Sequence, residues 1–264
     1  GGFSREFDGA QDYDFILRCA ENARSIYHIP KILYHWRAHP DSTAGDPKTK
    51  IYAFQAGRRA VAAHLKRVGV EASVSLTKFP GVQKIDYVLN SKEEFVVLGM
   101  EDATIIEGSL DQLKAIAQQE NVGVVGGAGC DRNHFIQCGV FLDFQNKKYE
   151  YVFEKEILTE GGYMDRIHTF QNYMAVCGPV VMRKSIYDRF KEESKELNGE
   201  AEIINLCLKA YEAGYENVYD PYVKFQYKNN RKDKNQEEIL MEKWGTKWKR
   251  DPYNNPNLKK GFWY

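Results

Sequence analysis

The sequence lacks an excess of charge of either sign. Lys and Arg together number 37, and Asp and Glu together also number 37, so the net charge is zero. A nucleic-acid-binding domain carries a clustered basic surplus, so this balance argues against nucleic acid as a partner. The basic run from Lys228 to Lys234 is a local exception, and its composition is typical of a solvated loop.

Long apolar runs are also missing. No stretch approaches the roughly 20 apolar residues that a membrane-spanning helix needs, and no signal peptide opens the chain. The chain opens instead on GGFSREFDGAQ, without an initiator Met, as the middle of a domain would. We therefore expect a fragment of a longer protein without a transmembrane segment. We expect it in the cytoplasm, either free or held at the inner face of the membrane by a peripheral or partner-protein contact.

Cysteine is scarce, and its five copies form no C-x-x-C pair. An odd count without such pairs argues against a disulfide framework and against a zinc ribbon. A reducing compartment fits this usage better than an oxidising one.

What the sequence does contain is an alternation of helical and extended patterns. Helical spacing runs from Asp12 to Ala23, from about Lys48 to Arg67 and from Glu200 to Ala213. SIYHIPKILYHWR suggests two short extended pieces, and EFVVLGM suggests a buried strand that ends on Glu101 and Asp102. VGVVGGAG reads as a strand that breaks into a glycine turn. This alternation predicts an α/β fold.

An internal repeat becomes visible when the chain is shifted by 191 residues. DYDFILRCAENARSIYHIPKILYHWR then falls on IINLCLKAYEAGYENVYDPYVKFQYK, with the apolar positions and one Pro in common. Asp12 falls on Ile203, and Asp14 falls on Asn205. The separation suggests duplicated domains, because solenoid repeats are shorter.

The first 45 residues closely resemble the C-terminal part of family 2 glycosyltransferase modules with the GT-A fold. The resemblance rests on GGFSREFDGAQDYDFILRCAENA and on IYHIPKILYHWRAHPDSTA. It implies that Asp12 opens a helix beneath the acceptor site and acts as the general base. It also implies that Asp14, His35 and Arg37 contact substrate, with His35 near the donor diphosphate. The alternative for Asp12 is helix-start electrostatics, which is worth about 0.3–1 kcal/mol.

From about Glu94 onward the chain resembles a second such module, of the kind found in tandem polysaccharide-synthesis enzymes. FVVLGMEDATII matches the strand that ends in the family's metal-binding acidic motif, which implies that Glu101 and Asp102 hold Mg²⁺ or Mn²⁺ in the intact enzyme. The alternative is a polar end to a buried strand. Thr104 replaces a frequent Glu, and Ile203 stands where the base is expected, so this module looks degenerate.

A complete module begins with a nucleotide-binding half, and the residues between Val74 and Glu101 are too few to contain one. We therefore predict an incomplete α/β fold of the GT-A type, with a mixed sheet flanked by helices and a helical linker. The predicted parts are the end of a first module at 1–45, a linker at 46–90, a degenerate second module at 91–231, and a terminal helix and tail at 232–264.

The expected function is part of an inverting glycosyltransferase. It would transfer a sugar from a nucleotide-sugar donor to a glycan acceptor in a bacterial surface polysaccharide. Such chemistry needs a base for the acceptor proton and a divalent metal to offset charge on the leaving diphosphate. The alternative is a non-catalytic scaffold that binds glycan or a partner protein.

Overall fold

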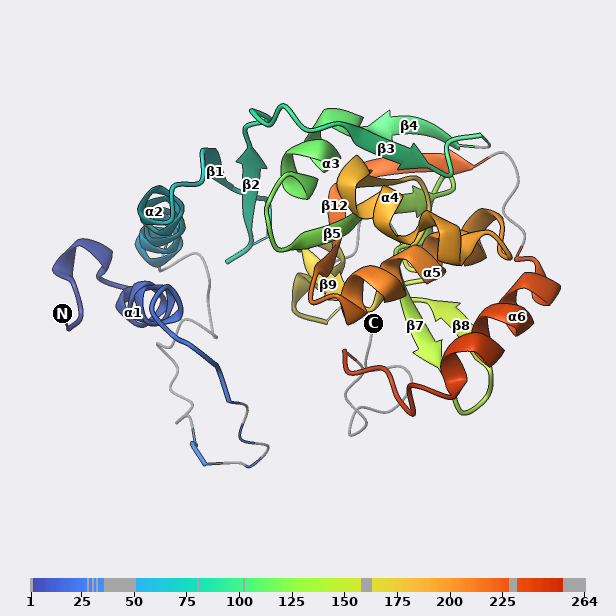
Figure 1. Cartoon of the computed structure of the whole chain (residues 1–264). Helices are drawn as coiled ribbons and strands as arrows, with labels where there is room; N and C mark the ends of the chain where they lie inside the picture. Colours follow the sequence, from blue (N-terminus) through green and yellow to red (C-terminus); the bar gives the residue numbers. More distant parts are fainter. Residues whose placement is uncertain are drawn as a thin grey trace. The chain divides into compact units, whose positions relative to one another are not determined.

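The computed structural model describes residues 2–27, 29, 31, 33–35, 51–79, 81–101, 103–157, 163–227 and 232–253. Contacts within the chain divide it into two compact units, Gly1–Val88 and Leu89–Tyr264 (Figure 1).

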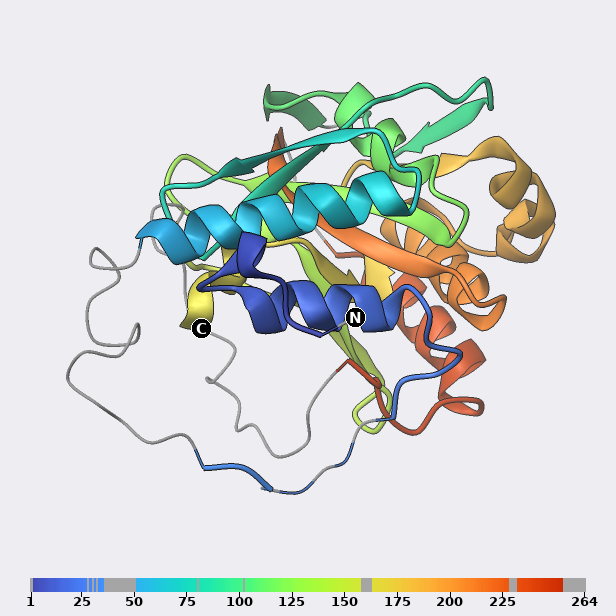
Figure 2. The same ribbon diagram turned by 90° about the vertical axis from the view of Figure 1, so that its left-hand side faces the viewer.

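The first unit consists of a short 3-10 turn, two helices and a hairpin. Its elements are η1 (Arg5–Phe7), α1 (Gln11–Ala20), α2 (Ile51–Arg67), β1 (Ala72–Leu76) and β2 (Gln83–Tyr87). α1 and α2 pack side by side (Figure 2), and β1 pairs antiparallel with β2. Val61 and Leu65 of α2 form a small core with Val74 of β1. The sequence predicts that Gly69 closes the helix that ends near Arg67, and its φ of +75° suits the end of a helix.

The extended pieces predicted in SIYHIPKILYHWR are not present as strands among the described residues of that stretch. β1 and β2 pair with each other and not with it. Its apolar side chains are exposed, including Ile26 at 82%, Tyr27 at 85% and Tyr34 at 80%. A strand needs a neighbouring strand as its hydrogen-bonding partner, and no strand in the described part of the first unit pairs with this stretch.

The second unit is organised around a mixed sheet of seven strands. Its main path runs β3–β11–β5–β12–β4, with β6 on β5 and β9 on β12. β5 and β12 are parallel, whereas β11 is antiparallel to both β3 and β5. The bounds are β3 (Phe95–Leu98), β4 (Ala103–Glu107), β5 (Val122–Cys130), β6 (Phe135–Gln137), β9 (Gln171–Tyr173), β11 (Val180–Arg183) and β12 (Glu216–Tyr227). A second sheet, in the order β10–β7–β8, comprises β10 (Ala175–Val176), β7 (Gly139–Asp143) and β8 (Lys148–Tyr151).

Helices pack on the two sheets of the second unit and on one another. They are α3 (Leu110–Ala117), α4 (Lys184–Phe190), α5 (Gly199–Glu212) and α6 (Lys234–Gly245), with 3-10 turns η3 (Tyr163–His168) and η4 (Lys191–Ser194). α3 packs on β5 and β11, and α5 packs on β5, β10 and β12; Figure 1 shows α4 and α5 on the near side of the sheet. The sequence LDQLKAIAQQ predicts a helix with Ser109 as its cap, and Ser109 accepts a hydrogen bond from Gln112 N at 3.3 Å. A mixed sheet flanked by helices confirms the predicted α/β class and is compatible with a GT-A-like fold.

The prediction of a glycine turn in VGVVGGAG is wrong, because β5 continues without a break to Cys130. The glycines are there for close packing. A Cβ on Gly127 would lie 2.4 Å from Phe225 Cε2, and one on Gly129 would lie 2.4 Å from Tyr227 Cε2. Both rings belong to β12, so the missing side chains of β5 make room for its parallel neighbour.

In the part of the chain that the structure describes, no helix has both the length and the apolarity to cross a membrane.

Candidate functional site

Asp12 lies in the first turn of α1, and its side chain is exposed. Its Oδ1 accepts a hydrogen bond from the backbone N–H of Tyr13 at 2.9 Å. The turn that leads into the helix is tight: Gly9 has φ of +94°, and a Cβ there would come 2.7 Å from a ring carbon of Tyr52 on α2. The carboxylate is therefore exposed at the start of a helix whose leading turn packs on α2. This geometry suits a general base, and it equally suits a helix-start residue, so the catalytic role of Asp12 stays a prediction.

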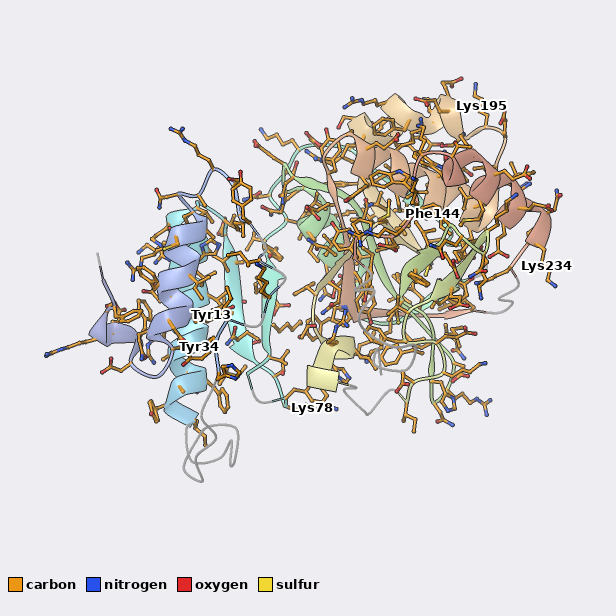
Figure 3. All side chains as sticks on the ribbon, turned by 90° about the horizontal axis from the view of Figure 1, so that it is seen from below. Tyr13, Tyr34, Lys78, Phe144, Lys195 and Lys234 are labelled. Carbon is orange, nitrogen blue, oxygen red and sulfur yellow. The ribbon has the colours of Figure 1, made fainter. Side chains whose placement is uncertain are left out.

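Asp14, two residues later, points the opposite way. It is fully buried, and its Oδ2 accepts a hydrogen bond from Arg18 Nε at 2.9 Å. Arg67 Nη1 of α2 lies 3.9 Å from its Oδ1. Asp14 thus joins α1 to α2 and fixes the rotation of α1 that exposes Asp12. The predicted contact between Asp14 and substrate stays a prediction. Tyr13, which is labelled on α1 in Figure 3, stands between the two carboxylates in the sequence. Its side chain is 40% exposed.

A second network holds the C-terminal end of α1. Glu21 accepts hydrogen bonds from Arg67 Nη2 at 2.7 Å and lies 2.7 Å from His64 Nδ1, both on α2. These hydrogen bonds, with that of Arg67 the larger, lower the pKa of Glu21 to about 2. Glu21 is therefore ionised throughout the physiological range, and α1 is fastened to α2 at both ends.

The other predicted residues of the first unit are less informative. His35 is exposed, in a stretch without helix or strand. Arg37 lies outside the described residues, as does Asp102 of the second unit.

In the second copy of the repeat the helix is retained, but the position of Asp12 is buried. Ile203, at the position of Asp12, is 5% exposed. Its Cδ1 would lie 3.1 Å from a Cβ on Gly99, the residue that follows β3. The place that a base would occupy is therefore filled by a packed apolar side chain.

Asn205, at the position of Asp14, is also fully buried. Its Nδ2 donates to Ser194 Oγ at 2.8 Å, and its Oδ1 accepts from Trp244 Nε1 of α6 at 2.9 Å. Asp14 and Asn205 thus have the same structural role in their units, because each side chain contacts the helix that follows the repeated helix. This correspondence supports the repeat read from the sequence.

Two carboxylates meet at the end of β3. Glu101 is exposed in the turn after the strand, and Glu202 lies partly buried in the first turn of α5. Burial, and then the charge of Glu101, raise the pKa of Glu202. A divalent cation with oxygen ligands would relieve this repulsion. No group of three or more metal-ligating side chains is found among the residues with described positions, so a metal site here stays a prediction.

Sequence reasoning missed the polar cluster around Glu200, which precedes Glu202 on α5. Its carboxylate accepts hydrogen bonds from Tyr149 at 2.9 Å, Tyr151 at 2.6 Å and Gln137 Nε2 at 2.6 Å. Lys232 Nζ lies over the rings of both tyrosines. Burial raises the pKa of Glu200 in spite of these donors. The cluster joins α5 to β6 and β8, so its contacts are structural.

Comparison with known proteins gives two relatives and no family. No family model matches the chain, and no solved structure matches it. An uncharacterized protein of Sinorhizobium fredii, y4gI, is 26% identical over 363 residues, covering 98% of this chain and 40% of the relative. The O-antigen biosynthesis protein RfbC of Myxococcus xanthus is 41% identical over 75 residues, covering 28% of this chain and 6% of the relative. The chain therefore spans less than half the length of either relative.

The alignment with the Sinorhizobium protein is longer than the chain. It extends over 363 residues, whereas the chain has 264, so at least 99 residues of the relative have no counterpart here. This chain is thus shorter than its relative within the aligned region.

Proposed function

We propose that this chain is part of a glycosyltransferase of bacterial surface polysaccharide synthesis, with Asp12 as the general base. The observation that carries the proposal is the contrast between two neighbouring carboxylates of α1. Asp14 is buried in ion pairs, whereas Asp12 is exposed on a fixed helix start. The name of the Myxococcus relative, an O-antigen biosynthesis protein, and the resemblance of the first 45 residues support the substrate class.

In the proposed reaction the Asp12 carboxylate takes the proton of an acceptor hydroxyl as that oxygen bonds to the anomeric carbon of the donor sugar. The bond from that carbon to the nucleotide diphosphate breaks, and its electron pair leaves with the diphosphate. The role of α1 is to hold Asp12 in one orientation, because proton transfer requires a base within hydrogen-bond reach of the reacting oxygen. Nucleotide sugars are cytoplasmic substrates, so this reaction would take place on the cytoplasmic side.

We infer that the second unit is a non-catalytic scaffold that binds glycan or a partner protein. The observation that favours this role is the side chain of Ile203, which is packed where a base would stand. Glu101 with Asp102 would be the position of a cation in this unit, and a bound Mg²⁺ or Mn²⁺ would supply charge neutralisation for a diphosphate.

The test is Asp12→Asn in the full-length protein that carries this chain. We expect the rate of sugar transfer to fall by roughly 10²–10⁴-fold, the usual contribution of a general base, while donor binding is unchanged. Asp8→Asn is the matched control, since Asp8 is an exposed carboxylate four residues earlier. Normal transfer by Asp12→Asn, or an equal loss in Asp8→Asn, would show that Asp12 is not the base.

A further inference from the structure

The C-terminal end of α1 borders a pocket of about 560 Å³ that lies wholly within the first unit. This size is in the range of small-molecule binding sites. Phe15, Cys19 and Asn22 line it, together with the charged residues Arg18, Glu21 and Arg67. None of these residues takes part directly in the proton transfer assigned to Asp12.

The charged groups of the pocket are balanced by one another. Arg18 is paired with the buried Asp14, and Arg67 donates to Glu21. Glu21 stays ionised because hydrogen bonds from Arg67 and His64 lower its pKa. An anion or a cation would have to compete with these pairs for a partner, at a cost in desolvation. The pocket is therefore matched to a neutral ligand.

Phe15 gives the pocket a flat apolar surface. Phe15 is 37% exposed, and its ring meets the ring of Phe3 edge-to-face, with 5.5 Å between centroids. The guanidinium of Arg18 lies over one face of the Phe15 ring, 5.6 Å from its centroid, so a stacked ligand would take the opposite face. Asn22 adds an exposed amide, oriented by a hydrogen bond from its Nδ2 to Arg18 O at 2.9 Å. A fixed aromatic face beside polar groups complements a sugar ring, which has an apolar C–H face and a rim of hydroxyls.

The pocket also has a defined relation to Asp12. Phe15 and Cys19 follow Asp12 by three and seven residues, so all three lie on one face of α1. At 1.5 Å per residue, Cys19 is about 10 Å along the helix from Asp12, roughly the length of two linked sugar units. A glycan whose end reaches Asp12 can thus extend along α1 to the pocket.

We propose that this pocket binds a neutral sugar unit of the acceptor glycan, stacked on Phe15 and hydrogen-bonded to Asn22 and the paired charges. The proposal rests on the proposed function for the class of ligand. Binding itself does not require the carboxylate of Asp12, so the two can fail separately.

Cys19 provides the reporter. It is exposed, whereas the other four cysteines, Cys130, Cys138, Cys177 and Cys207, are buried. Alkylation of the folded protein by N-ethylmaleimide therefore reports on the wall of the pocket. The probes are the methyl glycosides of glucose, galactose, mannose and rhamnose, with glucuronic acid as the charged counterpart. They are used at about 10 mM, because contacts with one ring give millimolar binding.

We expect at least one neutral glycoside to slow the alkylation of Cys19 about threefold, as mass action predicts for a mostly occupied site. Glucuronic acid should leave the rate unchanged. Phe15→Ala and Asn22→Ala should each abolish the protection; the second variant alters only an exposed side chain and covers the case in which the first unfolds the unit. Protection by no neutral glycoside, equal protection by glucuronic acid, or protection that survives both variants would overturn the proposal.

Asp12→Asn separates this proposal from the proposed function. Protection of Cys19 should persist in that variant. If transfer also persists, Asp12 is not the base, yet the sugar site stands. If transfer falls and no glycoside protects the wild-type protein, the base stands and the sugar site is wrong.

Discussion

Asp251 is expected to make the second unit less stable as the pH rises from about 4 to about 6. Its carboxyl group is 3% exposed and accepts hydrogen bonds from Leu142 N at 3.2 Å and Tyr253 N at 2.9 Å. Burial outweighs these two donors and raises the pKa of Asp251 from 3.8 to about 6. One pKa unit corresponds to about 1.4 kcal/mol, so the stability linked to this group is about 3 kcal/mol.

The sign follows from linkage. The folded state holds its proton to a higher pH than the unfolded state, so the contribution is complete below pH 3.8 and is lost as the pH passes about 6. Asp251→Asn removes this dependence, because an amide does not titrate. The variant carries a constant cost for turning an N–H₂ towards backbone donors, and that cost does not vary with pH.

The measurement is the free energy of unfolding of wild type and Asp251→Asn in urea, from pH 4 to pH 7.5. The variant should gain about 2.4 kcal/mol relative to wild type over this range, because part of the contribution is already lost at pH 4. This corresponds to about 5–10 °C in Tm for a unit of this size. Glu200 and Glu202 also have raised pKa values, and they cancel in the difference because both proteins contain them. A flat difference would show that the two hydrogen bonds balance burial, and a variant that loses ground as the pH rises would show that they outweigh it.

Two further substitutions test the packing inside each unit. Asp14→Ala leaves Arg18 and Arg67 without their buried partner and should lower the unfolding free energy of the first unit by roughly 2–3 kcal/mol in chemical denaturation. This is below the full value for a buried pair because both arginines are partly exposed. Asp12→Ala, on the exposed face, should change it by no more than about 0.5 kcal/mol, and equal losses in the two variants would contradict the structural role of Asp14. Gly127→Ala places a Cβ against Phe225 and should destabilise the second unit by at least about 1–3 kcal/mol by overpacking. Gly245→Ala is the control, because its new Cβ meets nothing within 4 Å. A Gly127→Ala protein as stable as this control would refute the packing argument.

Local signals in the sequence located the helices well. Apolar spacing and the Ser109 cap identified α3, and apolar spacing alone identified α1 and α5 within a few residues. β8 was missed because its alternation, KYEY, extends over only four residues. The glycines of β5 were misread because the rings that require them belong to β12, far along the chain. Glycine at a turn and glycine beneath a neighbouring ring have the same local signature.

The candidate site likewise combines features that local patterns predict with features that depend on distant parts of the chain. Asp12 was proposed as the base because the acidic helix start and its family resemblance are local. The opposite orientations of Asp12 and Asp14 depend on α2, which supplies Arg67, and no local pattern reports that contact. The approach of Glu202 to Glu101 depends on how α5 packs on the sheet, so it could not be derived from spacing.

The place of β3 at one end of the strand order bears on how this protein behaves at high concentration. Phe95–Leu98 are four consecutive apolar residues, all only half-buried, on a strand that pairs with β11 alone among the described strands. Such an edge is a template for self-association between molecules. Glu93 and Glu94 directly precede it, and Glu94 is tied to Lys184 at 2.8 Å. Charges that flank an apolar edge strand oppose such pairing, so Glu93 and Glu94 have a use that is independent of any candidate site.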